Sequence, residues 1–400
     1  MTSTEITNGV YYVGVNDRTT TKFEGIWPLP FGVTYNSYII RGNDKNVLID
    51  GVEIACCMKQ VEHIKNIDPN MTIDYLVINH MEPDHSGGIS VLKSIFPDMK
   101  IVGNAKTIDM VKGYYGISDG TVVISDGDTI DIGGKTLKFY LTPMVHWPET
   151  MMTYIVEDKV LFSGDAFGCF GALSGGIIDS EMDTEPYFPE MHRYYSNIVA
   201  KYGMFVQKAI AKLSGVEIDY ICSTHGPIWH EQLDKVIGIY DKLSRNEGEE
   251  GVVIAYASMY GNTEEMVDVI SRQLAINGIK KICIHNVSYS DESFILRDIY
   301  TYKGLIVVSP TYNGGAFPKI EALLSSLQLR GTSNKLFARA GSFTWASAGV
   351  KKIDAMCEKL KFTIIGDSIE MKQSITPEVT NKCVELANEF AKSLKSNFNK

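Results

Sequence analysis

The segment His80-Met81-Glu82-Pro83-Asp84-His85 brings four potential metal ligands into six consecutive residues. The apolar stretch Tyr75–Ile78 precedes it and Ser86-Gly87-Gly88 follows it, so we expect a loop at the end of a strand. Imidazole and carboxylate groups gathered in such a loop can bind a transition metal. A solvated acidic turn is the alternative, but a chain with eight histidines in 400 residues seldom produces this pattern by chance.

Three further residues extend this candidate metal site. Asp165 and His225 each follow an apolar stretch that predicts a strand, and His146 stands between another such stretch and Trp147-Pro148-Glu149. Any one of them alone would more often be a capping or exposed residue. Together with the first motif they supply four histidines and three carboxylates at junctions of strand and loop, which is enough for two metal ions that share a bridge.

A second candidate site begins with the loop Ser258–Thr263, which lies between an expected strand and an expected helix from about Glu264 to Asn277. Backbone N–H groups and the helix dipole at such a junction can hold a phosphate. The loop lacks the Gly-Lys-Ser/Thr of an ATP-binding loop and the Gly-x-Gly-x-x-Gly of a dinucleotide site. The loop is therefore a candidate phosphate site of neither kind, with an ordinary capped turn as the alternative.

Two later loops support a planar cofactor beside that phosphate. Each follows an expected strand and carries aromatic rings and glycine, and ligands of parallel sheets bind at the carboxyl ends of the strands. Core packing of the rings is the alternative. The predicted cofactor contacts are Ser258, Met259, Tyr260, Gly261, Asn262, Thr263, Pro310, Thr311, Tyr312, Asn313, Gly314, Ser342, Phe343, Thr344, Trp345 and Ala346.

These sites require two differently built domains. The polar stretch Ser244–Gly251 is typical of a linker, so we expect domains over residues 1–248 and 252–400. Short strands separated by turns, with a few helices between them, predict a layered α/β domain with much antiparallel sheet before the linker. Strands near 252–257, 281–286, 304–309, 335–341 and 362–368 alternate with helices after it, which predicts a doubly wound, five-stranded parallel sheet.

Composition narrows the function classes. A formal charge of −10 argues against nucleic acid as a partner, because phosphate binding needs clustered Lys and Arg. We expect no membrane span and no signal peptide, because no apolar run reaches about 18 residues and Met1–Gly9 is polar. The seven cysteines are odd in number and show no Cys-x-x-Cys spacing, which predicts a reducing, cytoplasmic environment rather than a disulfide framework.

The order of the metal-site residues resembles the metallo-β-lactamase superfamily, with one informative departure. The zinc hydrolases of that superfamily usually have His-x-His-x-Asp-His, and Glu82 replaces the second histidine here. A carboxylate makes the site harder and more anionic, which favours iron over zinc. The resulting pattern resembles flavodiiron proteins. Two aromatic stretches, Phe23–Pro30 and Gly32–Tyr38, resemble the same family, and residues 252–400 resemble a flavodoxin domain that binds FMN.

The resemblance implies a metallo-β-lactamase-like αββα sandwich followed by a flavodoxin-like domain. It places His80, Glu82 and His146 on one iron, Asp84, His85 and His225 on the other, and Asp165 between them. Tyr195 is a candidate for a hydroxyl that points toward the irons, with a locally satisfied core tyrosine as the alternative.

The family's activity is the reduction of O2 to water or of NO to N2O, through FMN and then a non-haem diiron centre. Because no rubredoxin-like Cys-x-x-Cys pair follows the flavodoxin-like domain, we expect a separate electron donor, rubredoxin or a similar small redox protein. The resemblance also implies a head-to-tail homodimer, either alone or as a dimer of dimers, with Trp147 and Trp345 near the junction. Two alternatives stay open: a metal hydrolase with a flavodoxin module, and a non-enzymatic FMN carrier or sensor.

Overall fold

The computed structural model describes residues 3–398 of the chain. Its contacts divide it into two compact units. The first unit takes most of the chain up to Tyr194 together with Met204–Asp241, and the second takes Tyr195–Gly203 and the chain from Lys242 onward. The division into domains over residues 1–248 and 252–400 remains a prediction. No helix within residues 3–398 is both long enough and apolar enough to cross a membrane.

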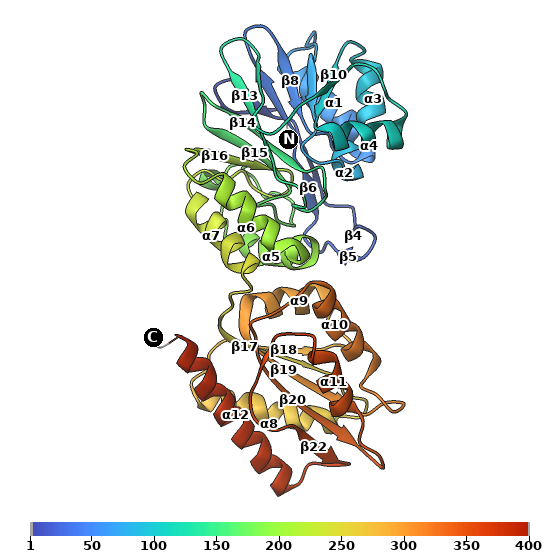
Figure 1. Ribbon diagram of the computed structural model, residues 1–400, viewed down its shortest axis with the longest axis vertical. Helices are drawn as coiled ribbons and strands as arrows, with labels where there is room; N and C mark the ends of the chain where they lie inside the picture. Colours follow the sequence, from blue (N-terminus) through green and yellow to red (C-terminus); the bar gives the residue numbers. More distant parts are fainter. Residues whose placement is uncertain (1–2, 399–400) are drawn as a thin grey trace. The chain divides into compact units, whose positions relative to one another are not determined.

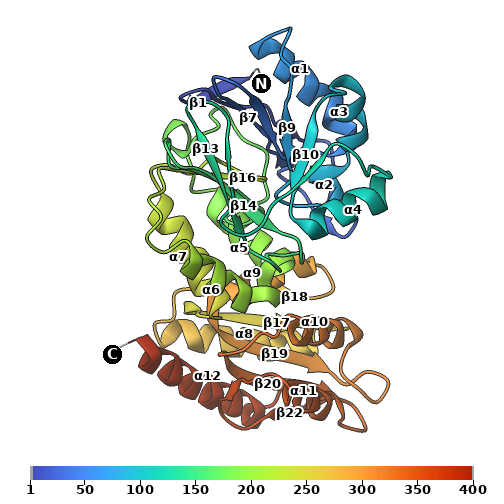
Figure 2. The same ribbon diagram turned by 45° about the horizontal axis from the view of Figure 1, so that its top comes forward.

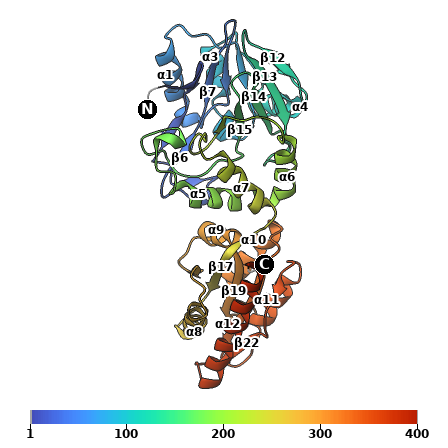
Figure 3. The ribbon, with the colours of Figure 1, turned by 90° about the vertical axis from the view of Figure 1, so that its left-hand side faces the viewer.

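The first unit contains two larger sheets with helices on their outer sides. Figure 1 shows α1, α3 and α4 beside β10, and α6 and α7 beside β16, while Figure 3 shows the sheet that contains β7 next to the one that contains β13 and β14. This is the αββα arrangement that was predicted. The seven-stranded sheet has the order β1 (Thr4–Thr7), β2 (Val10–Tyr12), β7 (Tyr38–Arg41), β8 (Asn46–Ile49), β9 (Tyr75–Val77), β10 (Lys100–Gly103), β11 (Thr121–Val123).

The second sheet has five strands, and two small hairpin-like pairs complete the unit. The five strands are β12 (Thr129–Asp131), β13 (Thr136–Leu141), β14 (Met151–Ile155), β15 (Val160–Gly164) and β16 (Tyr220–Ser223). The small pairs are β3 (Val15–Asp17) with β6 (Val33–Tyr35), and β4 (Lys22–Phe23) with β5 (Trp27–Pro28). The helices are α1 (Cys57–Ile67), α2 (Pro83–Ser86), α3 (Ile89–Ile95), α4 (Ala105–Tyr115), α5 (Tyr187–Tyr194), α6 (Gly203–Lys212) and α7 (Leu233–Ser244).

Burial explains why the strands that lead to the metal-site residues are continuous apolar runs. Val47, Leu48 and Ile49 of β8 are all fully buried, and they pair in parallel with β9. All five residues of β15 are buried, and β15 pairs in parallel with β16. Strands covered on both faces read as unbroken hydrophobic stretches rather than alternating ones. Their polar carboxyl ends therefore stand out in the sequence.

The second unit is a doubly wound parallel sheet, as predicted. The strand order β18, β17, β19, β20 and then β22 can be followed from top to bottom in Figure 2. Helices α8 and α12 share one hydrophobic core on one face, and α9, α10 and α11 share another core on the opposite face. The elements are β17 (Glu249–Tyr256), α8 (Asn262–Ile276), β18 (Ile282–Asn286), α9 (Glu292–Thr301), β19 (Tyr302–Pro310), α10 (Pro318–Leu329), β20 (Leu336–Phe343), α11 (Gly349–Cys357), β21 (Thr363–Ile364), β22 (Ile369–Lys372) and α12 (Pro377–Phe398).

The predicted fifth strand, 362–368, overlaps only β21, and β22 begins one residue beyond it; both are parallel to β20. Gly366 lies between the two pieces with φ +65°, a left-handed conformation that favours glycine. A Cβ at this position would also come within 2.6 Å of Leu386 Cδ1 on α12, so a larger residue would have to displace that side chain. The chain bends at this point and resumes pairing at Ile369.

Candidate metal centre and flavin site

Four predicted ligands form one cluster that could hold a metal ion. His80 Nε2 lies 3.2 Å from Glu82 Oε2, and His146 Nε2 lies 3.1 Å from the same oxygen. His146 Nε2 is also 3.0 Å from Asp165 Oδ2, and His80 Nε2 is 3.4 Å from it. One nitrogen or oxygen from each of these four residues could bind the same metal ion, because all four atoms lie within 4.8 Å of one another.

The second cluster contains Asp84, His85 and His225. His85 Nε2 lies 3.4 Å from Asp84 Oδ1, and His225 Nε2 lies 3.3 Å from Asp84 Oδ2. Asp165 faces this cluster with its other oxygen, since Oδ1 lies 3.0 Å from His85 Nε2 and 3.7 Å from His225 Nε2. Asp165 therefore presents Oδ2 to the first cluster and Oδ1 to the second, which is the geometry a bridging carboxylate needs.

Strand ends and one short helix bring these residues together. β9 ends at Val77, and His80 and Glu82 follow in the loop; Asp84 and His85 lie on α2, which begins at Pro83. Proline is favoured at the first position of a helix, because its missing N–H has no partner there in any case. Asp165 directly follows β15, and His225 lies two residues after β16. His146 lies farther from its strand than expected, because β13 ends at Leu141.

Hydrogen bonds to the outer nitrogens fix two of the histidine rings. His80 Nδ1 lies 2.9 Å from Glu149 Oε1, and His225 Nδ1 lies 2.6 Å from the carbonyl oxygen of Thr34. Donation from Nδ1 leaves the Nε2 lone pair free to bind a metal, a common arrangement around metal-binding histidines. Glu149 and Thr34 were not among the predicted site residues. Glu149 stands three residues after His146, but nothing in the sequence distinguishes it from an exposed acid.

The pKa shifts of the clustered residues show that positive charge is stabilised at both clusters. Burial would lower the pKa of His80, but Asp165, Glu149 and Glu82 outweigh it and raise that pKa well above its ordinary value. The same balance raises the pKa of His85 and of His146 to about 9. Burial opposes ionisation of Asp165, but His80 and His85 hold its pKa well below its usual range. Bound metal cations would balance the negative charge of the carboxylates while the histidine rings stay neutral.

Unpartnered buried atoms also fit a metal. Both carboxylate oxygens of Asp84 and Nε2 of His225 are buried and have no hydrogen-bond partner within residues 3–398. Buried polar atoms without partners are rare and costly in native proteins. Metal coordination would satisfy all three atoms.

Tyr194, rather than the predicted Tyr195, contacts the histidines. The Tyr194 ring centroid lies 5.5 Å from that of His225, and Tyr194 is fully buried. Tyr195 lies in the second unit, with its ring centroid 6.4 Å from that of Tyr300. The physical reason is local: α5 ends at Tyr194 and a π-helical turn begins at Tyr195, which rotates successive side chains differently from an α-helix.

The three predicted cofactor loops converge on one cavity of about 480 Å³. Fifteen of the sixteen predicted contacts line it, and the structure adds Ala348 and Gln373. Gly261 does not line the cavity. It precedes α8 with φ +91° and donates its N–H to Ser258 Oγ at 3.1 Å, so it shapes the loop instead.

Short hydrogen bonds hold the cofactor loops together. Thr263 Oγ1 lies 2.8 Å from Ser342 Oγ, and the Thr311 N–H donates to the Ser342 carbonyl at 2.7 Å. Trp345 and Tyr260 are 90% and 89% exposed beside the cavity, so neither is a core residue. Exposed rings beside the N-terminus of α8 fit a phosphorylated, planar cofactor such as FMN.

Comparison with known proteins gives two family matches. Residues 33–226 match the family described as "ODP family beta lactamase", and residues 254–386 match "Flavodoxin". An uncharacterized protein of Methanocaldococcus jannaschii is 35% identical over 97% of this chain and 98% of its own length. An anaerobic nitric oxide reductase flavorubredoxin of Escherichia coli is 32% identical over 97% of this chain and 81% of its own length.

Two solved structures resemble the whole chain. Rubredoxin oxygen:oxidoreductase from Desulfovibrio gigas has a TM-score of 0.94 at 28% identity, and each chain is covered completely. The flavodiiron protein from Giardia intestinalis has a TM-score of 0.93 at 28% identity, covering 99% of this chain and 97% of that one.

Proposed function

This chain belongs to the flavodiiron protein family, and from that membership we infer that it is an oxidoreductase that reduces O2 to water, couples NO to N2O, or does both. The observation that carries this proposal is Asp165, whose two oxygens face two separate ligand clusters. The names of two similar proteins support both gases: one is a nitric oxide reductase and the other an oxygen oxidoreductase. The alternative of a zinc hydrolase is disfavoured by Glu82 in the first cluster.

We propose the following roles for the residues of the metal centre. His80, Glu82 and His146 would hold one iron, Asp84, His85 and His225 the other, and Asp165 would bridge them. When bound, two irons supply electrons and binding positions for the two atoms of the gas. Glu149 and the Thr34 carbonyl orient His80 and His225, while Thr224 Oγ1 donates to Asp165 Oδ1 at 2.6 Å and fixes the bridging carboxylate.

The second unit would hold FMN in the cavity between its three loops. The backbone at the start of α8 and the hydroxyls of Ser258 and Thr263 would bind the phosphate, and the rings of Tyr312 and Trp345 would flank the isoalloxazine. FMN exchanges electrons singly or in pairs, and the protein orients it. A rubredoxin or similar small redox protein would be the donor, as the name of the Desulfovibrio gigas enzyme indicates for that protein.

We further propose a head-to-tail homodimer that works in the cytoplasm. Support for the dimer comes from exposed apolar side chains near each candidate site: Trp345 and Tyr260 beside the flavin cavity, and Ile26 and Phe31, 53% and 64% exposed, near the β4–β5 hairpin. Support for the compartment comes from the cysteines, which are all free.

Subunit mixing tests the dimer. One inactive variant carries His85→Ala, and the other carries Asn262→Ala with Thr263→Val to lose FMN. In a head-to-tail dimer, a mixed pair retains one intact route between the flavin of one chain and the irons of the other. Gas reduction should therefore recover partly after subunit exchange. An active monomer, or no recovery after proven exchange, would contradict the dimer.

Gas consumption tests the proposed activity. Iron-loaded, FMN-loaded protein with a reduced donor should consume O2 or NO, whereas the zinc-loaded protein should not. Hydrolysis of a β-lactam or thioester at the zinc-loaded site, without gas consumption by the iron form, would favour the hydrolase.

A further inference from the structure

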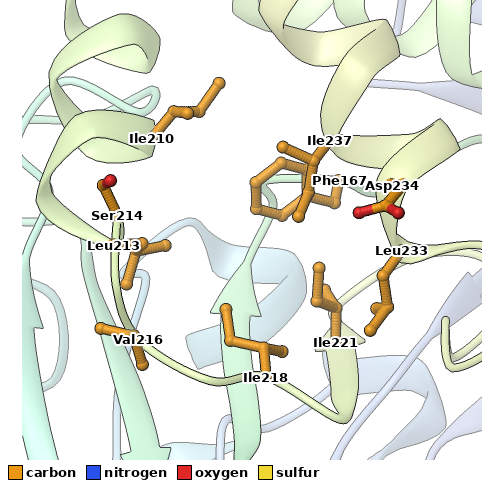
Figure 4. Close-up of a pocket in the computed structure, with 10 residues that line it drawn as sticks. All are labelled: Phe167, Ile210, Leu213, Ser214, Val216, Ile218, Ile221, Leu233, Asp234 and Ile237. Carbon is orange, nitrogen blue, oxygen red and sulfur yellow. The ribbon is translucent and has the colours of Figure 1, made fainter.

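An apolar cavity of about 330 Å³ lies in the first unit, and none of its lining residues is a proposed metal ligand or flavin contact. Figure 4 shows its lining side chains arranged around a common hollow. The lining comes from α6, α7, β16, the loop before β16 and the segment after β15. The cavity is lined by Phe167, Ile210, Leu213, Ser214, Val216, Ile218, Ile221, Leu233, Asp234 and Ile237.

The inner part of this cavity offers water no hydrogen-bonding side chains. Phe167, Leu213 and Ile221 are buried, and the two polar lining residues, Ser214 and Asp234, are exposed. Apolar cavities of about 150 Å³ stay dry and bind xenon or small apolar molecules. A hollow of this size and lining therefore suits small apolar molecules better than polar ones.

Phe167 and its neighbour Gly168 connect the lining of the cavity with two of the proposed metal ligands along the chain. Phe167 lines the cavity and is two residues from Asp165 in the chain. Its neighbour Gly168 lies against both ligand residues: a Cβ at Gly168 would lie 3.0 Å from the Asp165 carbonyl oxygen and 3.5 Å from His225 Cβ. On its other side, the Phe167 ring packs against Tyr240, with 5.0 Å between the ring centroids. A path from the hollow to the surroundings of His225 would therefore have to pass Phe167 and Gly168.

We propose that this cavity, the α6–α7 pocket, concentrates the diatomic gas and delivers it past Phe167 to the metal centre. This inference rests on the proposed function, since it takes O2 or NO as the ligand. Both gases are small and nearly apolar, so they partition from water into such a hollow, whereas ions and polar metabolites do not. The exposed residues Ser214 and Asp234 mark the side on which the pocket meets solvent.

Xenon, an apolar probe of similar size, tests occupancy without any turnover. Crystals of the protein pressurised with xenon should show xenon in the α6–α7 pocket. Ile237→Trp should fill the pocket and abolish the xenon peak. Ala211→Trp is the matched control, because Ala211 lies on α6 but is exposed and does not line the pocket. Val216→Phe provides a milder filling variant if Ile237→Trp fails to fold.

Steady-state kinetics tests delivery. The filling variants should raise the KM for the gas by about threefold or more with kcat unchanged, because access is impaired and the chemistry is not. Ala211→Trp should leave both constants at the parent values. Absence of xenon from the pocket, or an unchanged KM in a variant whose pocket is shown to be filled, would overturn the proposal. Xenon bound in a protein that consumes no gas would instead refute the proposed function and, with it, delivery.

Discussion

Replacing Glu149 by alanine should lower both the stability of the protein and its affinity for iron, although every proposed metal ligand is retained. Glu149 Oε1 accepts from two buried donors, His80 Nδ1 and the Met81 N–H, each at 2.9 Å. Glu149 is 1% exposed and His80 is fully buried. Alanine would leave both donors without a partner, and each buried unsatisfied donor costs about 1–3 kcal/mol. The free energy of unfolding should therefore fall by about 2–6 kcal/mol.

The same change should weaken iron binding. Loss of an outer hydrogen bond to a metal-binding histidine typically costs about 10–100-fold in metal affinity. Here Glu149→Ala frees the His80 ring to rotate and to place its proton on either nitrogen. Glu149→Gln is the matched control, because its side-chain oxygen can still accept from both donors. Glutamine should therefore retain most of the stability and most of the iron affinity.

Denaturant unfolding and competitive chelator titration measure the two quantities separately. The expected order is parent, then Glu149→Gln, then Glu149→Ala, for stability and for iron affinity alike. If Glu149→Ala bound iron as tightly as the parent, the bond from His80 to Glu149 would have no part in orienting the ligand.

Four other substitutions probe the ligand set, the flavin cavity and a buried lysine. Glu82→His should shift the metal content toward zinc and abolish gas reduction, because it removes a hard anionic ligand; metal analysis with a gas electrode checks both. Asp165→Ala should lower iron content more than His146→Ala does, since both clusters lose a shared anion; equal losses would refute the bridge. Gln373→Ala should weaken FMN binding measured by flavin fluorescence while leaving iron content unchanged, because Gln373 lines only the flavin cavity. Lys335→Met should remove a pH dependence of stability. Burial lowers the pKa of Lys335 to about 7 from an ordinary 10.5, so the unfolded chain binds more protons between these values and the parent's free energy of unfolding rises with pH there. Unfolding curves taken across that interval should lose this slope in the variant, and an unchanged slope would show that Lys335 is not its source.

Most of the metal-site residues could be predicted from the sequence because they lie in segments that follow buried strands; His146 is the exception, since β13 ends at Leu141 and is only partly buried. The parallel pairs β8–β9 and β15–β16 consist of apolar runs, so a polar residue at their ends is conspicuous. The flavin loops were predictable for the same reason, since they follow β17, β19 and β20. Whether these residues bind iron and FMN remains a proposal.

Other parts of the site depend on contacts between distant segments. Glu149 and Thr34 reach their histidines only in the folded chain, 69 and 191 residues away in the sequence. The π-helical turn Tyr195–Val199 directs the Tyr195 side chain away from that of Tyr194, and a turn of five residues is too short to produce a recognisable sequence pattern. Gln373 enters the flavin cavity because its N–H pairs with the Phe343 carbonyl at 2.8 Å, beyond the end of β22.

In the proposed function, one chain combines a diiron centre with FMN to reduce a diatomic gas. The most direct test is gas uptake by protein of known cofactor content, supplied anaerobically with a reduced donor and then with O2 or NO. Protein that holds about two irons and one FMN per chain should consume the gas, and uptake should fall in proportion when either iron or FMN is withheld. Full cofactor content with no uptake of either gas, or equal uptake by the zinc-loaded protein, would contradict the account.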